Sequence, residues 1–256
     1  MRLVALVSMA ALVGAQNVAS EAPRKLEHVC TPQDEDTFGL TCSEDDPCPV
    51  FLELNAAESN GAILFVTGDL HTQNTTLFGL LLESDDGGAT WTEPNSISPA
   101  PMGQRLASST LEEIQFADSQ HGWIAGVKLD PLPRDPFLLA TTDGGKTWQR
   151  NPLFEDPLFG SIQQFWFDSP SSGELALDRS QGATRRYDRY ATMTGGSSWE
   201  LQGSDNKPIP LARAKPKENA GWRVRVEKDA YRVERRAADG SWAGVASFAV
   251  HAGDCR

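Results

Sequence analysis

The apolar residues of this chain fall in short runs rather than in helical stripes. Past residue 15, short runs rich in β-branched and aromatic side chains alternate with Gly, Asn, Asp and Thr. This pattern predicts antiparallel strands. The first predicted strands cover residues 49–54, 62–67, 76–83, 113–116, 123–129, 137–142 and 147–151. The later ones cover residues 161–167, 174–178, 186–192, 198–202, 209–212, 221–227, 231–236 and 242–250.

A motif of the form Ser/Thr-x-Asp-x-Gly-x-Thr/Ser-Trp recurs between these strands; we call it an Asp box. The first copy contains Ser84, Asp86, Gly88, Thr90 and Trp91. The second contains Thr141, Asp143, Gly145, Thr147 and Trp148. The third contains Thr192, Gly196, Ser198 and Trp199, with Thr194 at the Asp position, and residues 239–242 form a shortened fourth copy. The tryptophans are 57, 51 and 43 residues apart, about the length of a four-stranded propeller blade.

The chemistry of the Asp box indicates a structural role. Asp followed by Gly-Gly favours a tight hairpin, because glycine adopts positive φ without steric cost. The carboxylate can accept backbone N–H groups and close the turn. The tryptophan then starts the next strand, where its indole can pack between neighbouring sheets. We therefore expect each box to be a hairpin that carries its own wedge.

These observations predict an all-β fold, a small β-propeller of about four four-stranded blades. The propeller domain is expected over residues 48–256, with blades at about 48–95, 111–152, 161–203 and 208–251. Antiparallel sheets of this kind bury their faces by stacking on one another. A closed ring and an unclosed half-ring that dimerises are both compatible with four units.

The ends of the chain predict export and disulfide bonding. Residues 1–15 have the positive start, apolar run and small terminal residues of a cleaved signal peptide, so we expect a periplasmic or secreted protein. Residues 16–47 are expected to be a tail. The four cysteines, Cys30, Cys42, Cys48 and Cys255, indicate two disulfides, of which at least one should join the two ends. Their pairing stays open. No later run has the length of a transmembrane helix.

The formal charge of −12 argues against nucleic acid as a partner, because an acidic chain repels polyphosphate. No cofactor, metal or catalytic residue is predicted. His71 follows Asp69 in an expected turn, and the other histidines lie in different units, so a solvent-facing loop histidine is favoured over a metal ligand. The expected partner is another protein.

The second unit carries a family resemblance. Residues 116–126, which include Phe-Ala-Asp and His-Gly-Trp-Ile-Ala-Gly, followed by the box at 141–148, resemble one blade of the photosystem II assembly and stability factor family. The Asp boxes are also similar to those of sialidases and sortilin-type receptors. The resemblance covers residues 48–199 and implies a non-catalytic binding platform. It does not map that family's arginine patch onto residues of this chain.

The alternative function is glycan binding or a sialidase-like glycoside hydrolase. Such an enzyme needs paired carboxylates beneath an arginine cluster, and the early arginine motif is missing here. Residues in loops or in basic and aromatic clusters are the candidates for a binding surface. They are His71, His121, Arg134, Arg186 and Tyr187.

Overall fold

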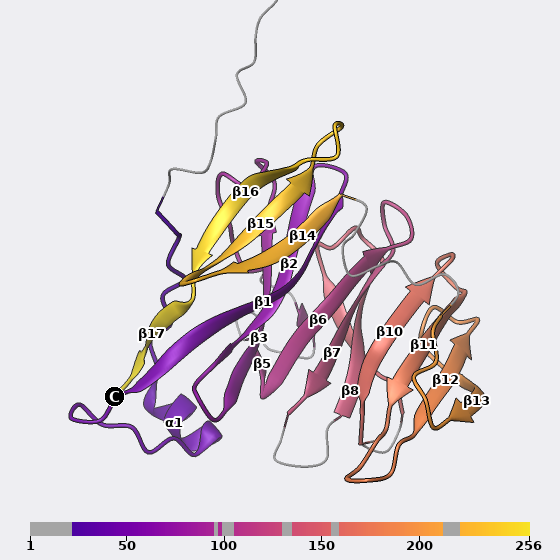
Figure 1. Cartoon of the computed structure of the whole chain (residues 1–256), viewed down its shortest axis with the longest axis horizontal. Coiled ribbons are helices and arrows are strands. Elements are labelled where there is room, and N and C mark those ends of the chain that lie inside the picture. The colour runs from indigo at the N-terminus through magenta and orange to yellow at the C-terminus, as the bar shows by residue number, and fades with distance from the viewer. Residues whose placement is uncertain (1–21, 95–96, 99–104, 130–134, 155–158, 212–220) are drawn as a thin grey trace, which may run out of the picture.

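The computed structural model describes residues 22–94, 97–98, 105–129, 135–154, 159–211 and 221–256. Four mainly antiparallel sheets stand side by side as the blades of a small β-propeller, which confirms the predicted fold class (Figure 1). The expected signal peptide lies outside the described residues. The described chain has no helix that is long and apolar enough to cross a membrane.

The strands group into blades as follows. Blade 1 contains β1 (Cys48–Asn60), β2 (Ile63–His71), β3 (Thr76–Ser84), β5 (Leu106–Ala107) and β17 (His251–Cys255). Blade 2 contains β4 (Ile97–Ser98), β6 (Ser109–Phe116), β7 (Gly122–Lys128), β8 (Asp135–Thr141) and β9 (Trp148–Pro152). Blade 3 contains β10 (Ser161–Phe167), β11 (Gly173–Asp178), β12 (Tyr187–Thr192) and β13 (Glu200–Asp205). Blade 4 contains β14 (Trp222–Glu227), β15 (Ala230–Arg236) and β16 (Trp242–Ala249).

The blades follow one another along an arc in the order 4, 1, 2, 3 (Figure 1). β14 packs against β1, β6 packs against the strands of blade 1, and β10 packs against those of blade 2. Among the described strands, no pair joins blade 3 to blade 4 in this way. Apolar side chains fill three clusters, which lie between blades 4 and 1, between blades 1 and 2, and between blades 2 and 3.

The Asp boxes share one hydrogen-bonding scheme. In the second box, the Thr141 hydroxyl accepts the N–H of Gly145 at 2.9 Å, and Asp143 accepts the N–H and hydroxyl of Thr147 at 2.9 and 2.6 Å. The first box repeats these bonds. In the third box, the hydroxyl of Thr194 accepts the N–H of Ser198 at 2.9 Å in place of a carboxylate. The hairpins therefore close in the same way with or without Asp.

Each of the first three boxes also packs against another blade. The Trp91 indole meets Phe248 of blade 4 edge-on at 5.5 Å between ring centroids, and Trp148 meets Phe65 of blade 1 at 6.1 Å. Gly196 of the third box faces Leu138 of blade 2. The shortened fourth box differs, because a Cβ added to Gly240 would meet nothing within 4 Å.

Blade 4 departs from the prediction. Residues 209–211 form no strand, and residue 212 lies outside the described residues. Pro208 and Pro210 supply no N–H donors to a ladder, which explains why a strand fails to form there. Instead, the main chain of Arg24 exchanges hydrogen bonds of 2.8 Å with Ser247 and Ala249 of β16. An N-terminal segment thus lies along the β16 edge of blade 4, opposite the β14 edge at which the predicted strand would have paired.

Two disulfides fix the ends of the chain. The terminal disulfide joins Cys30 to Cys255 across 225 residues, and the local disulfide joins Cys42 to Cys48 across six. Helix α1 (Pro32–Phe38) lies between them and starts with a capping box at Thr31. Side chains from residues 26–42 pack against the core of blades 1 and 4. The described part of the expected tail, residues 22–47, is therefore held against the sheets rather than free.

Candidate functional site

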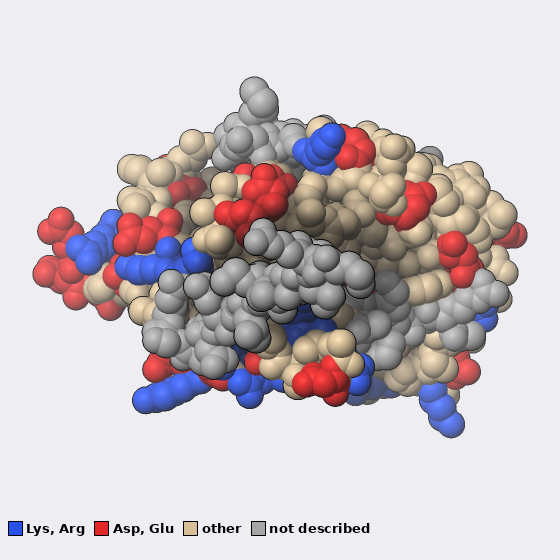
Figure 2. Space-filling view, turned by 90° about the horizontal axis from the view of Figure 1, so that it is seen from above, with Lys and Arg blue, Asp and Glu red and all other residues tan. Residues whose placement is uncertain are grey.

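A cavity of about 860 Å³ lies where the inner strands of blades 1, 2 and 3 converge. Strands β1, β2, β6, β7 and β10 form its walls, and residues 208–210 pass along one side. This volume lies within the range of ordinary ligand sites. Figure 2 looks down on the molecule and shows a hollow near the middle of the view, with acidic side chains on its rim.

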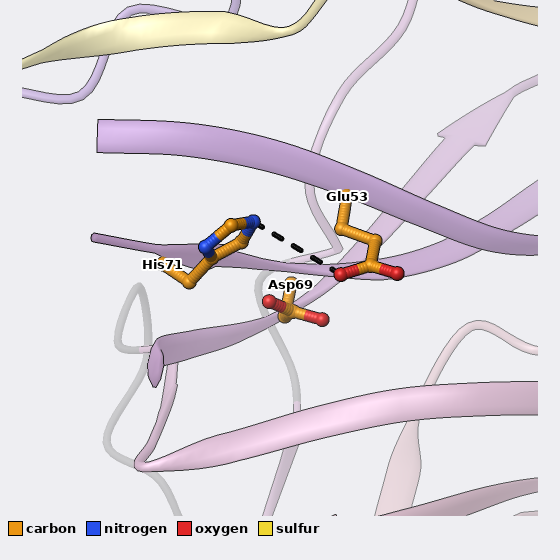
Figure 3. Close-up of side chains that lie close together, drawn as sticks. All are labelled: Glu53, Asp69 and His71. Atoms are coloured by element: carbon orange, nitrogen blue, oxygen red, sulfur yellow. Dashed lines mark ion pairs between the residues drawn. The ribbon is translucent and has the colours of Figure 1, made fainter. Parts of the chain in front are cut away.

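Three potential ligand groups converge in this cavity (Figure 3). Asp69 and His71 are two residues apart on β2 and therefore project from the same face of the sheet. Glu53 lies directly opposite Asp69 in the β1–β2 pairing. One ligand atom from each of the three residues lies within 4.8 Å of the others, and Nε2 of His71 is 4.0 Å from Oε2 of Glu53. We call these residues the cavity triad.

The environment of the triad is unusual for carboxylates. Asp69 is only 5% exposed, and its carboxylate accepts a hydrogen bond from the Thr110 hydroxyl at 2.8 Å. Burial raises the pKa of Asp69 to about 6; the Thr110 hydrogen bond opposes this rise and Glu53 adds to it. In the described part of the chain, no Lys or Arg forms an ion pair with Asp69 or Glu53. The triad therefore concentrates negative charge beside a cavity.

Supporting bonds orient two members of the triad. Nδ1 of His71 lies 2.8 Å from the carbonyl oxygen of Thr72 and donates its proton there, which leaves the Nε2 lone pair facing Glu53. The Thr110 hydroxyl accepts a hydrogen bond from the side-chain amide of Asn55 at 3.3 Å and donates its own hydrogen to Asp69. Hydrogen bonds thus restrict the orientation of both the His71 imidazole and the Asp69 carboxylate.

The structure corrects the prediction for His71. The sequence indicated a solvent-facing turn, but His71 is the last residue of β2 and its side chain is only 31% exposed. Strand β2 continues four residues beyond the predicted end at residue 67, because Leu70 is buried and pairs with both neighbouring strands. The sequence analysis also missed Glu53 and Asp69. The available signal was the Asp-x-His alternation, which places both side chains on one face of a strand.

The other candidate residues do not join this site. His121 lies in the turn between β6 and β7, where its ring contacts Asp118 at 3.0 Å, at the opposite end of β6 from Thr110. Arg134 lies outside the described residues. Arg186 is half exposed and donates to Asp188, whereas Tyr187 is buried. His121, Arg186 and Tyr187, the other candidates that the structure describes, are therefore not among the residues that line the cavity.

Arg179, Arg186 and Arg189 of blade 3 form ion pairs with carboxylates of the same blade. Asp188 is fully buried and accepts hydrogen bonds from Arg186, Ser204 and Arg179. Burial alone would raise the pKa of Asp188, but these hydrogen bonds, led by that from Arg186, hold it below its usual range. In blade 4, Arg223 and Arg225 pair with Glu234 in the same manner. Arg179, Arg186, Arg223 and Arg225 are thus charge-compensated by carboxylates of their own blades.

The sialidase-like alternative required carboxylates beneath an arginine cluster. Glu53 and Asp69 supply neighbouring carboxylates, but no arginine lines the described walls of the cavity.

A second groove, of about 580 Å³, lies between α1 and blade 1. There Arg105 makes a bidentate pair with Glu93 at 2.6 and 2.7 Å and contacts His28 at 3.0 Å. Burial, reinforced by Arg105, lowers the pKa of His28.

Comparison with known proteins places the chain in a family. The Photosystem II assembly lipoprotein Ycf48 of Synechococcus sp. (strain CC9902) is 35% identical over 127 residues, which are 49% of this chain and 32% of that protein. The chloroplastic Photosystem II stability/assembly factor HCF136 of Arabidopsis thaliana is 26% identical over 202 residues, which are 79% of this chain and 43% of that protein. The chain thus spans less than half the length of these relatives.

A solved structure of YCF48 bound to a D1 peptide superposes with a TM-score of 0.39 at 19% identity, covering 77% of this chain and 53% of that one. The family model for photosynthesis system II assembly factor YCF48 matches residues 55–250, which extends from β1 to the end of β16 and includes all four boxes. This match confirms the resemblance seen in the second blade and extends it through the fourth. The chain belongs to the photosynthesis system II assembly factor YCF48 family.

Proposed function

We propose that this protein is a non-catalytic assembly factor that binds a segment of a partner protein. The match of the assembly-factor family model over residues 55–250 carries this proposal. A relative in the same family is named as a photosystem II assembly factor, and a solved YCF48 structure holds a D1 peptide. A subunit of a photosystem-type membrane complex is accordingly the proposed class of partner.

The central cavity is the proposed binding site for that segment. Rigid strands of three blades shape it, and a site on strands holds its geometry better than one on loops. Its walls carry Glu53, Asp69, Glu112 and Glu113 but no described arginine or lysine. A negative cleft in a low-dielectric wall attracts positive groups. The segment is therefore proposed to be rich in lysine, arginine or other hydrogen-bond donors.

A binding role accounts for the cavity better than glycoside hydrolysis does. Sialidase-like chemistry uses arginines to hold the substrate carboxylate, whereas Arg179, Arg189 and Arg223 pair with Asp or Glu on their own blades. We also propose that the protein acts outside the cytoplasm. Residues 1–15 support export, and the relative from Synechococcus is named a lipoprotein.

Fluorescence anisotropy with labelled peptides tests the proposal. Peptides tiled along D1 are compared with scrambled versions of the same peptides, using the chain with both disulfides formed. We expect at least one basic tile to bind more tightly than its scrambled control, and binding to weaken as salt rises. If no tile binds better than its control, the peptide-binding proposal is wrong. Turnover of any substrate in a glycan panel would overturn the non-catalytic part.

Matched variants locate the site. Glu112→Gln with Glu113→Gln removes two negative charges from the cavity wall, and Glu44→Gln with Asp45→Asn removes two from an exposed loop near the local disulfide. Both double variants change the net charge equally. We expect only the cavity variant to weaken binding, on the order of tenfold. Equal weakening by both would show that overall charge, not the cavity, attracts the peptide.

A further inference from the structure

We propose that Glu53, Asp69 and His71 bind a divalent first-row transition metal ion, with Zn²⁺ as the best fit. The proposal goes beyond peptide binding and does not depend on it. One imidazole nitrogen and two carboxylate oxygens are a donor set that suits such ions. Ca²⁺ and Mg²⁺ prefer oxygen ligands throughout, so the histidine argues against both.

The geometry lies close to that of a metal site. Two ligands at about 2.1 Å from a tetrahedral ion stand roughly 3.4 Å apart. Nε2 of His71 and Oε2 of Glu53 are 4.0 Å apart, and all three ligand atoms lie within 4.8 Å of one another. The Glu53 side chain is half exposed, so a small rotation about its side-chain torsions can bring its carboxylate inward. Asp69 and His71 lie on the same strand, and their side chains lie close to Glu53 (Figure 3).

The supporting bonds favour metal binding independently of the ligand distances. A metal-binding histidine commonly donates its other ring nitrogen to a backbone carbonyl, which fixes the tautomer. His71 does so through Nδ1 to Thr72 and leaves Nε2 available. Thr110, which itself accepts a hydrogen bond from Asn55, donates a hydrogen bond to Oδ2 of Asp69 and so limits the rotation of that carboxylate. These bonds fix ligands from β2 before any ion arrives.

Charge also favours a cation at this place. Asp69 is almost fully buried and has a second carboxylate as its neighbour, with no lysine or arginine paired to either among the described residues. Close carboxylates without a counter-charge repel each other. A bound divalent ion would neutralise both. The cavity of about 860 Å³ beside the triad leaves room for water or a partner group at the remaining coordination positions.

Competing sites on the chain are weaker. All four cysteines are in disulfides, so no thiolate is available. His251 with Asp254 offers one imidazole and one carboxylate at 3.3 Å on the surface, without a third ligand in the described residues. Changing His251 is therefore a matched control for changing His71.

Calorimetric titration of the tag-free, chelator-treated chain with Zn²⁺ tests the proposal. We expect one ion per chain, and Co²⁺ in its place should give visible d–d absorption typical of low coordination. His71→Gln and Glu53→Gln should each weaken Zn²⁺ binding on the order of a hundredfold, while His251→Gln leaves it unchanged. Thr110→Val, which changes a positioning residue, should weaken it on the order of tenfold.

Several outcomes would overturn the assignment. They are the absence of stoichiometric Zn²⁺ binding by the unmodified chain, equal binding by the His71 and Glu53 variants, and tighter binding of Ca²⁺ than of Zn²⁺. Far-ultraviolet circular dichroism checks that every variant is folded. Asp69→Asn serves as a further variant, because its amide oxygen can still accept the Thr110 proton while the negative charge is lost. It should fold and bind Zn²⁺ weakly; unchanged binding would also contradict the proposal.

Discussion

Replacing Gly145 with alanine tests whether the Asp boxes lock one blade to the next. Gly145 has φ of +99°, and a Cβ added there would lie 2.4 Å from the ring of Phe65 in blade 1. Phe65 is fully buried and contacts both Phe116 and Trp148, so its ring has no free space to enter. The substitution must therefore push blades 1 and 2 apart or distort the hairpin.

The cost can be divided into backbone and packing parts. A left-handed backbone costs a non-glycine residue roughly 1–2 kcal/mol. Overpacking a filled core costs about 1–3 kcal/mol more. Gly87 in the first box is the matched control, because its φ of +75° is also positive but an added Cβ would meet nothing within 4 Å. Gly145→Ala should therefore lower the unfolding free energy by about 1–3 kcal/mol more than Gly87→Ala does.

Urea unfolding followed by tryptophan fluorescence measures the difference, with both disulfides kept intact. Trp148 lies beside the altered contact, so its emission reports on the same seam. Equal losses for the two alanine variants would refute the reasoning. In that case the boxes act only as hairpins, and the ring contacts between blades contribute little.

Three further predictions concern the two disulfides, the third Asp box and the pH dependence of stability. Changing both cysteines of the terminal disulfide to serine should cost about 5 kcal/mol of unfolding free energy, against about 2 kcal/mol for the local one, because the closed loops span 225 and six residues; equal losses in urea would contradict this ranking. Thr194→Asp should stabilise by on the order of 1 kcal/mol through charged hydrogen bonds to Ser198; a lower calorimetric Tm would oppose this. Hydrogen bonds from Thr90 lower the pKa of Asp86 from 3.8 to about 2, so its stabilisation is complete above about pH 4 and disappears as pH falls through 2. Asp86→Asn should therefore lose less stability than the unmodified chain as pH falls from about 4 to 2, measured by urea midpoints at each pH. The same decrease in both proteins would show that Asp86 does not contribute this stability.

The sequence predicts the repeated hairpins well because their cause is local. Each box needs only a hydroxyl, an acceptor and two glycines within eight residues, and these close the turn whatever surrounds it. The shared hydrogen bonds of the three boxes follow from that spacing. The spacing of the boxes along the chain also predicts the blade length, because each sequence repeat folds into one blade. Thr194 shows that the motif tolerates loss of the carboxylate when another oxygen replaces it.

The cavity triad could not be predicted in the same way because it depends on strand register. Asp69 and His71 are two residues apart, but Glu53 joins them only through the pairing of β1 with β2. A bulge in β1 between Leu54 and Ala56 shifts that register, and nothing in the sequence marks it plainly. The prediction for His71 considered only the other histidines as further metal ligands and not the carboxylates of Glu53 and Asp69. The supporting bond from Thr110 comes from a different blade again.

The contact between blades 4 and 1, which we call the terminal seam, is where the Cys30–Cys255 disulfide and the pairing of Arg24 with β16 are found. Blades 1 and 2, and blades 2 and 3, are neighbours in sequence as well as in space, so their contacts close short loops. Blade 4 instead packs on blade 1, which brings Arg24 beside Phe248 and Cys30 beside Cys255. Loop-closure entropy grows with the length of chain enclosed, so this seam costs more to close than the others. Strand β17, which continues from β16 into blade 1, and the Trp91–Phe248 contact both reinforce it. The terminal disulfide thus acts at the contact where restricting the unfolded chain has the largest effect.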